Sequence, residues 1–174
     1  MLPRVSNMLA PAPLHTELMT ELRLRGFEGD LAPAYGDRVV SATDNSIYQL
    51  LPQILVFPRT IDDLVRIARA AADARFEEIV FAPRGGGTGT NGQSLTDGLV
   101  VDVSRHMNRI LEINAAERWV RVQAGVVKDQ LNAALAEHGL FFPPELLQSR
   151  NDRWHDQHRC KRPRLLSVWE NAGS

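Results

Sequence analysis

The sequence has little cysteine, little net charge and no long apolar run. One cysteine, Cys160, among 174 residues excludes an internal disulfide framework and fits a reducing cytoplasm. A formal net charge of −1 gives no electrostatic reason to expect nucleic acid or an anionic membrane as a partner. No apolar run reaches the length of a membrane span, and prolines interrupt the N-terminal stretch where a signal peptide needs continuous apolar residues. These absences predict a soluble, cytoplasmic protein with no transmembrane segment.

The composition that remains is that of one globular domain, but it changes at about Leu146. The whole chain is 44% hydrophobic and 24% charged. Residues 147–174 hold six Lys and Arg against three acidic residues, together with Trp154, Trp169 and Cys160. The first 146 residues hold 14 basic and 18 acidic residues, a net charge of −4. Two compositions therefore share the chain.

The first 146 residues alternate between helical and extended patterns. LHTELMTELRLRG predicts a helix that ends at Gly26, and ILVFPRT predicts a buried strand stopped by Pro58. Thr60 and Asp63 resemble a capping box at the start of a helix. Its expected buried stripe consists of Ile61, Leu64, Val65, Ala68, Ala71 and Ala72. Further strands are expected in EIVFAP, GLVVDVS, RILEIN and WVRVQA, followed by a helix that ends at Gly139.

The chemistry is expected in PRGGGTGTNGQ, between two of these strands. Gly87, Gly89 and Gly92 match the GxGxxG dinucleotide fingerprint, which works by opening a helix onto the pyrophosphate. Here QSLTDG, a turn rather than a helix, separates the last glycine from the next strand, so this interpretation fails its context test. The stretch also does not match the phosphate-binding loop of nucleoside triphosphatases, because no GK[ST] follows the glycines.

A glycine-rich anion nest is the interpretation that the residues favour. Four of the six residues from Gly85 to Thr90 are glycine, so backbone N–H groups can turn toward one anion without obstruction by Cβ atoms. Arg84 is expected to pair with phosphate or with an internal carboxylate. The alternative is an ordinary glycine-rich hairpin turn. The predicted phosphate-binding residues are Arg84, Gly85, Gly86, Gly87, Thr88, Gly89, Thr90, Asn91, Gly92 and Gln93.

This stretch resembles the pyrophosphate loop of the PCMH-type FAD-binding domain, also called the vanillyl-alcohol oxidase type. The resemblance extends over TDNSIYQLLPQILVFPRTIDDLVRIARAA and over RGGGTGTNGQSLTDGLVVDVSRHMNRILEIN, and it continues to Leu146. Within the family it is greatest to the large bacterial FAD-linked dehydrogenases of the D-2-hydroxyglutarate and D-lactate group. The resemblance implies FAD as cofactor, held by the amides of the glycine loop, and a small 2-hydroxy acid as substrate. It also implies a substrate domain and an iron–sulfur region further along such a protein.

The tail departs from the family's pattern at a definite point. After PPEL the family carries a second flavin-binding segment of the form SNRATIGGMINTDASGQG. Permitted codons for LQSRNDRWHDQHRCKRPR, when read from the second base, encode that segment. We therefore interpret residues 147–174 as a frameshifted, non-native and disordered tail. His155, His158 and Cys160 lack a zinc-ligand spacing, so no metal site is predicted.

The sequence thus predicts an incomplete PCMH-type FAD-binding domain of the α+β class, with mixed sheets and flanking helices. Residues 1–30 are expected to form a helical lead-in, residues 31–146 the partial domain, and residues 147–174 the tail. The function expected is that of the N-terminal fragment of a flavin-dependent oxidoreductase acting on a 2-hydroxy acid, inactive alone and with no catalytic residue of its own. The competing hypothesis is a non-enzymatic nucleotide- or partner-binding module that uses the glycine nest alone.

Overall fold

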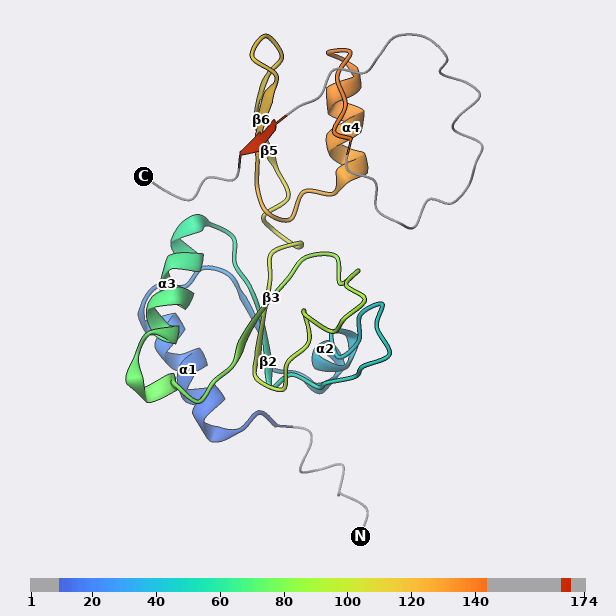
Figure 1. Cartoon of the computed structure of the whole chain (residues 1–174). Coiled ribbons are helices and arrows are strands. Elements are labelled where there is room, and N and C mark those ends of the chain that lie inside the picture. Colours follow the sequence, from blue (N-terminus) through green and yellow to red (C-terminus); the bar gives the residue numbers. More distant parts are fainter. Residues whose placement is uncertain (1–9, 144–166, 170–174) are drawn as a thin grey trace. The chain divides into compact units, whose positions relative to one another are not determined.

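A four-stranded mixed sheet organises the first part of the chain (Figure 1). The computed structural model describes residues 10–143 and the backbone of residues 167–169, in two units divided between Asn108 and Arg109. The sheet has the order β1-β2-β4-β3. These strands are Asp30–Ala32 (β1), Ile54–Phe57 (β2), Phe81–Arg84 (β3) and Leu99–Asp102 (β4). β1 pairs with β2 antiparallel, whereas β2 and β3 each pair with β4 in parallel.

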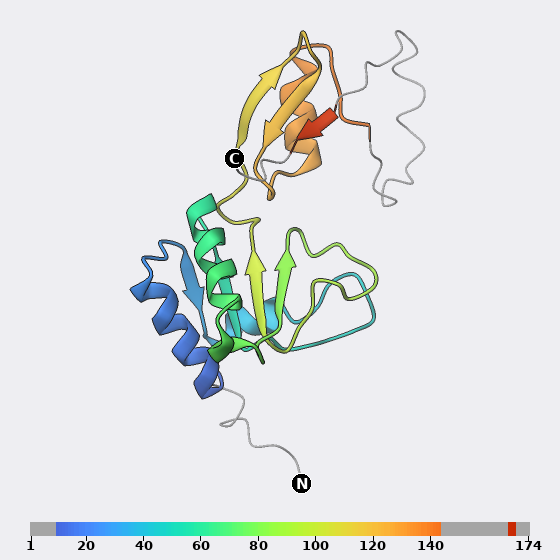
Figure 2. The same cartoon turned by 60° about the vertical axis from the view of Figure 1, so that its left-hand side comes forward.

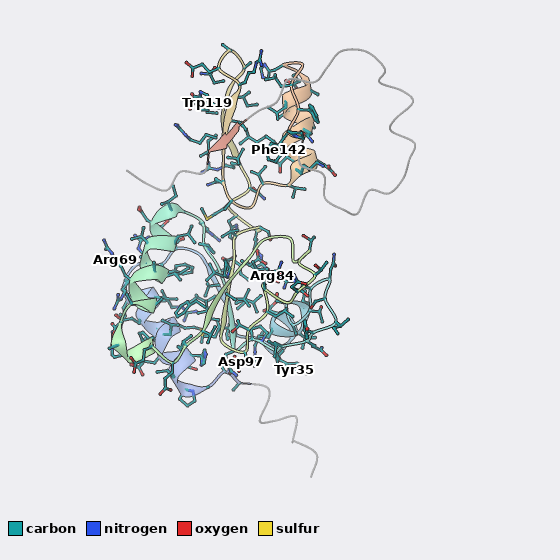
Figure 3. All side chains as sticks on the ribbon, viewed as in Figure 1. Tyr35, Arg69, Arg84, Asp97, Trp119 and Phe142 are labelled. Carbon is teal, nitrogen blue, oxygen red and sulfur yellow. The ribbon has the colours of Figure 1, made fainter. Side chains whose placement is uncertain are left out.

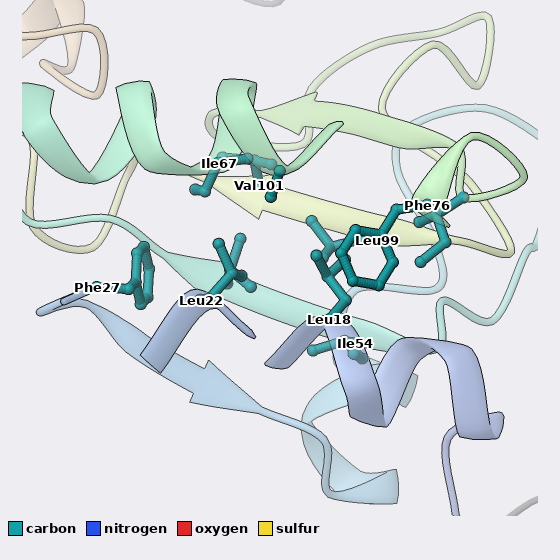
Figure 4. Close-up of a cluster of buried hydrophobic side chains, with 11 residues drawn as sticks. Leu18, Leu22, Phe27, Ile54, Ile67, Phe76, Leu99 and Val101 are labelled. Atoms are coloured by element: carbon teal, nitrogen blue, oxygen red, sulfur yellow. The ribbon is translucent and has the colours of Figure 1, made fainter. Parts of the chain in front are cut away.

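Helices cover one face of this sheet. α1 (Pro13–Leu24) and α3 (Ile61–Ala71) pack against each other on the same side of the strands (Figure 2). Leu18 and Leu22 of α1 are fully buried with Ile54 of β2 and Leu99 of β4 (Figure 4). These two leucines make α1 part of the core of this unit. Burial of each leucine side chain contributes about 1.5–3 kcal/mol to the stability of the fold. The short elements α2 (Tyr35–Val40) and η2 (Ala74–Phe76) complete the unit.

Local sequence signals account for the helix ends. α1 stops where Gly26 takes a φ of +80°, as the sequence predicted. Thr60 caps the N-terminus of α3, and its hydroxyl accepts a hydrogen bond from the Asp63 amide at 3.2 Å. The predicted strands of this unit are present, and no helix interrupts residues 85–98.

The predicted buried stripe of α3 is wrong on one side of the helix. Ile61 and Val65 are 47% and 40% exposed, while Asp63, Ile67 and Ala70 are buried. The reason lies in Asp63, whose fully buried carboxylate accepts hydrogen bonds from the Glu28 and Arg59 amides at 2.9 and 3.0 Å. A carboxylate with such partners can face the core, and hydrophobic periodicity does not detect it.

The second unit contains a hairpin and a helix. β5 (Ile110–Asn114) and β6 (Trp119–Val122), which lie in two of the predicted strand segments, pair antiparallel, and β7 (Ser167–Trp169) pairs with β6 in parallel. α4 (Lys128–Ala136) buries Leu131 and Leu135 against Val120 of β6, and Gly139 takes a φ of +65° after the helix. The expected α+β class, with mixed sheets and flanking helices, is confirmed. Most of the predicted tail lies outside the described residues.

Candidate functional site

The glycine loop leaves the sheet at the carboxyl end of β3. Arg84 is the last residue of that strand, and the next strand, β4, starts at Leu99. Because β3 and β4 are parallel, residues 85–98 must return along the whole length of the strands to the other edge. They do so without a helix (Figures 1 and 2). The helix N-terminus that the dinucleotide fingerprint requires is therefore absent from the described loop.

The glycines of the loop meet different surroundings. Gly87 and Gly92 adopt φ values of +65° and +72°, where residues with a Cβ are strained. Gly85 and Gly86 do not have positive φ values. A Cβ atom on Gly85 would meet no atom within 4 Å, and one on Gly86 would meet only Cγ2 of Thr88 at 3.6 Å. The packing of the described protein therefore does not require glycine at these two positions.

The middle of the loop presents unpaired donors. Within the described residues, the backbone N–H groups of Gly86 to Thr90 form no hydrogen bond with a protein acceptor. The next amide, that of Asn91, donates to Oε1 of Gln93 at 3.2 Å. Thr88, Thr90 and Asn91 are exposed. Successive free amides with room above two glycines form a suitable environment for a phosphate group.

Arg84 bonds to backbone carbonyls, and not to the internal carboxylate that was one of its two expected partners. Its guanidinium donates from Nη2 to the Thr43 carbonyl at 2.9 Å and from Nη1 to the Ser41 carbonyl at 3.4 Å. Nη1 also lies 3.5 Å from the Ser94 hydroxyl. No ion pair joins Arg84 to a carboxylate of the described residues. Its side chain lies beside the loops near α2 (Figure 3).

A second segment, residues 41–48, lies alongside the glycine loop. The Ser94 hydroxyl donates to Oδ2 of Asp44 at 3.3 Å, and the Ser46 amide donates to Oδ1 at 2.8 Å. Hydrogen bonds from the Ser46 side chain and amide, and then from Ser94, hold the pKa of the Asp44 carboxyl below its usual value, and the positive charge of Arg84 acts in the same direction. The ring of Tyr48 approaches Gly92, where a Cβ atom would lie 3.0 Å from Cδ2.

The sequence patterns predicted no role in the site for residues 41–48. A usable signal was present, because Thr43, Asp44 and Ser46 are short polar residues gathered between α2 and the buried strand β2. Such residues bond readily to nearby backbone, which marks ordered turns, and Ser46 bonds in this way to both Asp44 and Tyr48. Their contact with a loop some 40 residues later in the chain becomes visible only in the folded structure.

A separate cluster of charged side chains surrounds Asp30. His106 lies 2.7 Å and Arg59 3.0 Å from its carboxylate, and the Arg105 guanidinium stacks 3.5 Å from the Phe57 ring centre. The hydrogen bond with His106, followed by the charges of His106 and Arg59, lowers the pKa of Asp30. One carboxylate among three basic groups is suited to joining β1 to the ends of β2 and β4.

The described residues contain neither a metal-binding group nor a membrane-spanning helix. No three His, Cys, Asp or Glu side chains among residues 10–143 gather in a way that would hold a metal ion. His155, His158 and Cys160 lie outside the described residues. In the part of the chain that the structure describes, no helix is long and apolar enough to cross a bilayer.

Comparison with known proteins identifies similar sequences and folds. A family model described as an FAD binding domain matches residues 52–151. D-2-hydroxyglutarate dehydrogenase of Pseudomonas putida is 61% identical over 82% of this chain, and that of Pantoea ananatis is 58% identical over 86%. The chain spans only 14% and 15% of those two proteins. The solved structure of an alkyldihydroxyacetonephosphate synthase has the same fold over 80% of this chain and 30% of its own, with a TM-score of 0.65 and 19% identity.

Proposed function

The chain belongs to the family of FAD-binding domains, and on that premise we propose that it is part of a flavin-dependent oxidoreductase acting on a small 2-hydroxy acid. The proposed substrate class is that of D-2-hydroxyglutarate or D-lactate. Relatives at 61% and 58% identity that are named D-2-hydroxyglutarate dehydrogenase support it. Because the chain spans 14% and 15% of their length, the proposal concerns the activity of a longer protein.

The observation that carries the proposal is the exposed middle of the glycine loop. The free N–H groups of Gly86 to Thr90 are proposed to bind the diphosphate of FAD, with the side chains of Thr88, Thr90 and Asn91 as additional donors. The open space beside Gly85 and Gly86 supports this role, since the protein itself leaves it unfilled. A phosphate that approaches the backbone closely gives these positions a reason to lack a Cβ atom.

The chemistry of the reaction belongs to the cofactor. Bound FAD supplies an acceptor for the hydride on the α-carbon of the hydroxy acid. The residues described here are proposed to hold and orient the cofactor through its diphosphate. None of them is assigned a proton-transfer step, and the residues that handle the substrate are proposed to lie in other parts of the longer protein. We further propose a cytoplasmic location, which the single cysteine supports.

Ligand titration followed by amide NMR tests the phosphate site on the chain itself. FAD and inorganic pyrophosphate are each expected to shift the amide signals of Gly86 to Thr90, whereas riboflavin, which has no phosphate, leaves them in place. Weak binding is expected, because we interpret residues 147–174 as a frameshifted form of the second flavin segment, and amide NMR detects weak binding. If FAD shifts only amides outside residues 84–93, the site is wrong. Binding of other phosphate ligands but not of FAD would favour the non-enzymatic module.

Turnover is tested in a second experiment. The 174-residue chain is expected not to oxidise D-2-hydroxyglutarate or D-lactate in a dye-linked assay. A version with the frame corrected after Leu146 and extended through the rest of the protein is expected to oxidise one of them and to show a bound flavin spectrum. Turnover by the 174-residue chain above a no-enzyme control, abolished by a change at Gly87, would refute the expected inactivity of the short form.

A further inference from the structure

We propose that Arg84 is a positioning residue that braces the glycine loop before any cofactor binds, and that it is not a ligand of the diphosphate. The inference rests on the proposed function for the role of the loop. The bracing itself is a property of the protein without ligand. It is directed at residues 41–48, which we call the bracing segment.

The first argument is the set of acceptors that Arg84 already has. Both terminal nitrogens of its guanidinium bond to backbone carbonyls of the bracing segment, those of Thr43 at 2.9 Å and Ser41 at 3.4 Å. Carbonyl oxygens are strong acceptors that need a partner when they are removed from water, and Ser41 is a buried residue. If the guanidinium turned toward a phosphate, it would leave these carbonyls without their donor. The planar fork of donors suits two fixed carbonyls better than a flexible ammonium does.

The second argument is that the bracing segment contacts the loop at both ends. At the start of the loop, Arg84 bonds to the carbonyls of Ser41 and Thr43. At the end of the loop, the Ser94 hydroxyl donates to Asp44 at 3.3 Å, and the Tyr48 ring lies against Gly92. Within the described residues, the amides between these ends, from Gly86 to Thr90, bond to no protein acceptor. The loop is thus fixed where it meets the protein and open in its middle.

The third argument is the position of Gly87 over the Arg84 side chain. A Cβ atom on Gly87 would collide with Nη2 and lie 2.8 Å from Cζ of Arg84. The loop therefore turns back across the guanidinium, and the backbone at Gly87 rests on the braced side chain. Glycine-rich segments lose the most conformational freedom on ordering, so a brace that orders them during folding removes that cost from cofactor binding.

Amide hydrogen exchange of the 174-residue chain without FAD tests the proposal. Arg84→Lys keeps the positive charge but cannot reach both carbonyls with the same geometry. We expect exchange to become at least about fivefold faster at the hydrogen-bonded amides of Ser46 and Tyr48 in the bracing segment and of Asn91 in the loop. The core amides of β2 and β4 are expected to keep their protection. The matched control is Arg59→Lys, an exposed arginine bonded to Asp30 and not to the loop, and it is expected to leave both segments unchanged.

A second readout separates bracing from phosphate binding. If Arg84 is a phosphate ligand instead, Arg84→Lys leaves exchange in the free chain unchanged, and this result overturns the proposal. If the core amides of Arg84→Lys also lose protection, the substitution has disturbed the whole fold, and Ser94→Ala serves as the test variant in place of Arg84→Lys. That variant removes only the hydroxyl that joins Arg84 to Asp44. It is expected to speed exchange in the bracing segment by about twofold, and unchanged exchange would again overturn the proposal. Failure of the frame-corrected, extended protein to bind FAD would contradict the proposed function, while faster exchange in the variants of the 174-residue chain would still support bracing.

Discussion

Gly87 lies against the guanidinium of Arg84, so close that a Cβ atom at this glycine would be 2.8 Å from Cζ of the arginine. Its φ of +65° adds a second reason for glycine at this position. Both reasons come from the protein itself. At Gly85 and Gly86 neither reason applies, and this contrast allows folding and ligand binding to be tested separately.

Gly86→Ala is expected to weaken binding of FAD and pyrophosphate without destabilising the fold. A methyl group here meets only Thr88, at 3.6 Å, but it would stand where a phosphate must approach the amides. We expect at least a tenfold loss of affinity by NMR titration, about 1.4 kcal/mol, and a free energy of unfolding unchanged or raised by up to about 1 kcal/mol. Gly87→Val is the comparison, and it should lower both affinity and stability. Unchanged affinity in Gly86→Ala would place the phosphate site elsewhere.

Asp63→Ala is expected to be strongly destabilising. The Asp63 carboxylate is completely buried and accepts the amides of Glu28 and Arg59 and a contact from Arg66 at 3.2 Å. Its removal leaves three donors without their acceptor and a void at a buried position, which together cost roughly 3–5 kcal/mol. Asp62→Ala, at an exposed position of the same helical turn, is the control and should cost less than about 1 kcal/mol. Urea denaturation measures both, and equal losses would show that the buried carboxylate has no special role.

The two faces of α3 provide another matched pair. Ile67→Ala should lower the free energy of unfolding by about 2–4 kcal/mol, because Ile67 is only 5% exposed and packs in the main core. Val65→Ala should change it by less than about 0.5 kcal/mol, because Val65 is 40% exposed. The midpoints of urea denaturation of the two variants, each compared with wild type, measure these changes. A larger loss for Val65→Ala would restore the stripe that the sequence suggested.

His15 is expected to make stability depend on pH below about 6.5. Burial is the main cause that lowers its pKa, and its two ring nitrogens, shielded from water, have no hydrogen-bond partner among the described residues. The unfolded chain therefore takes up a proton, as pH falls through about 6.5, that the folded chain resists, and stability declines. Carboxylates with lowered pKa values, such as Asp44, contribute losses only at more acidic pH.

The measurement is urea denaturation at pH 7.5 and pH 5.5. His15→Leu should reduce the loss of stability between the two pH values, while His138→Gln, at an exposed position after α4, should not. An identical pH dependence in wild type and His15→Leu would show that His15 titrates normally in the folded protein.

Patterns confined to neighbouring residues predicted much of the fold. The Thr60 cap, the left-handed Gly26 and Gly139, and the apolar strand at residues 54–57 all appear where the sequence placed them. Each depends on φ preferences, on hydrogen bonds within one turn, or on a continuous run of β-forming residues. The prediction for the inner face of α3 was wrong because the buried Asp63 obtains one of its partners, the Glu28 amide, from a distant part of the chain.

The sequence by itself determined that this chain carries a glycine-rich loop between two strands without a helix, and this ruled out the usual dinucleotide fingerprint. Tertiary structure alone decided that Arg84 bonds to the carbonyls of Ser41 and Thr43, and which glycines the protein requires for its own packing. The physical reason is the distance along the chain over which each interaction acts. Glycine content and strand periodicity act through adjacent residues, whereas an arginine's choice among phosphate, carboxylate and carbonyl depends on which distant backbone the folded chain brings within about 3 Å of it.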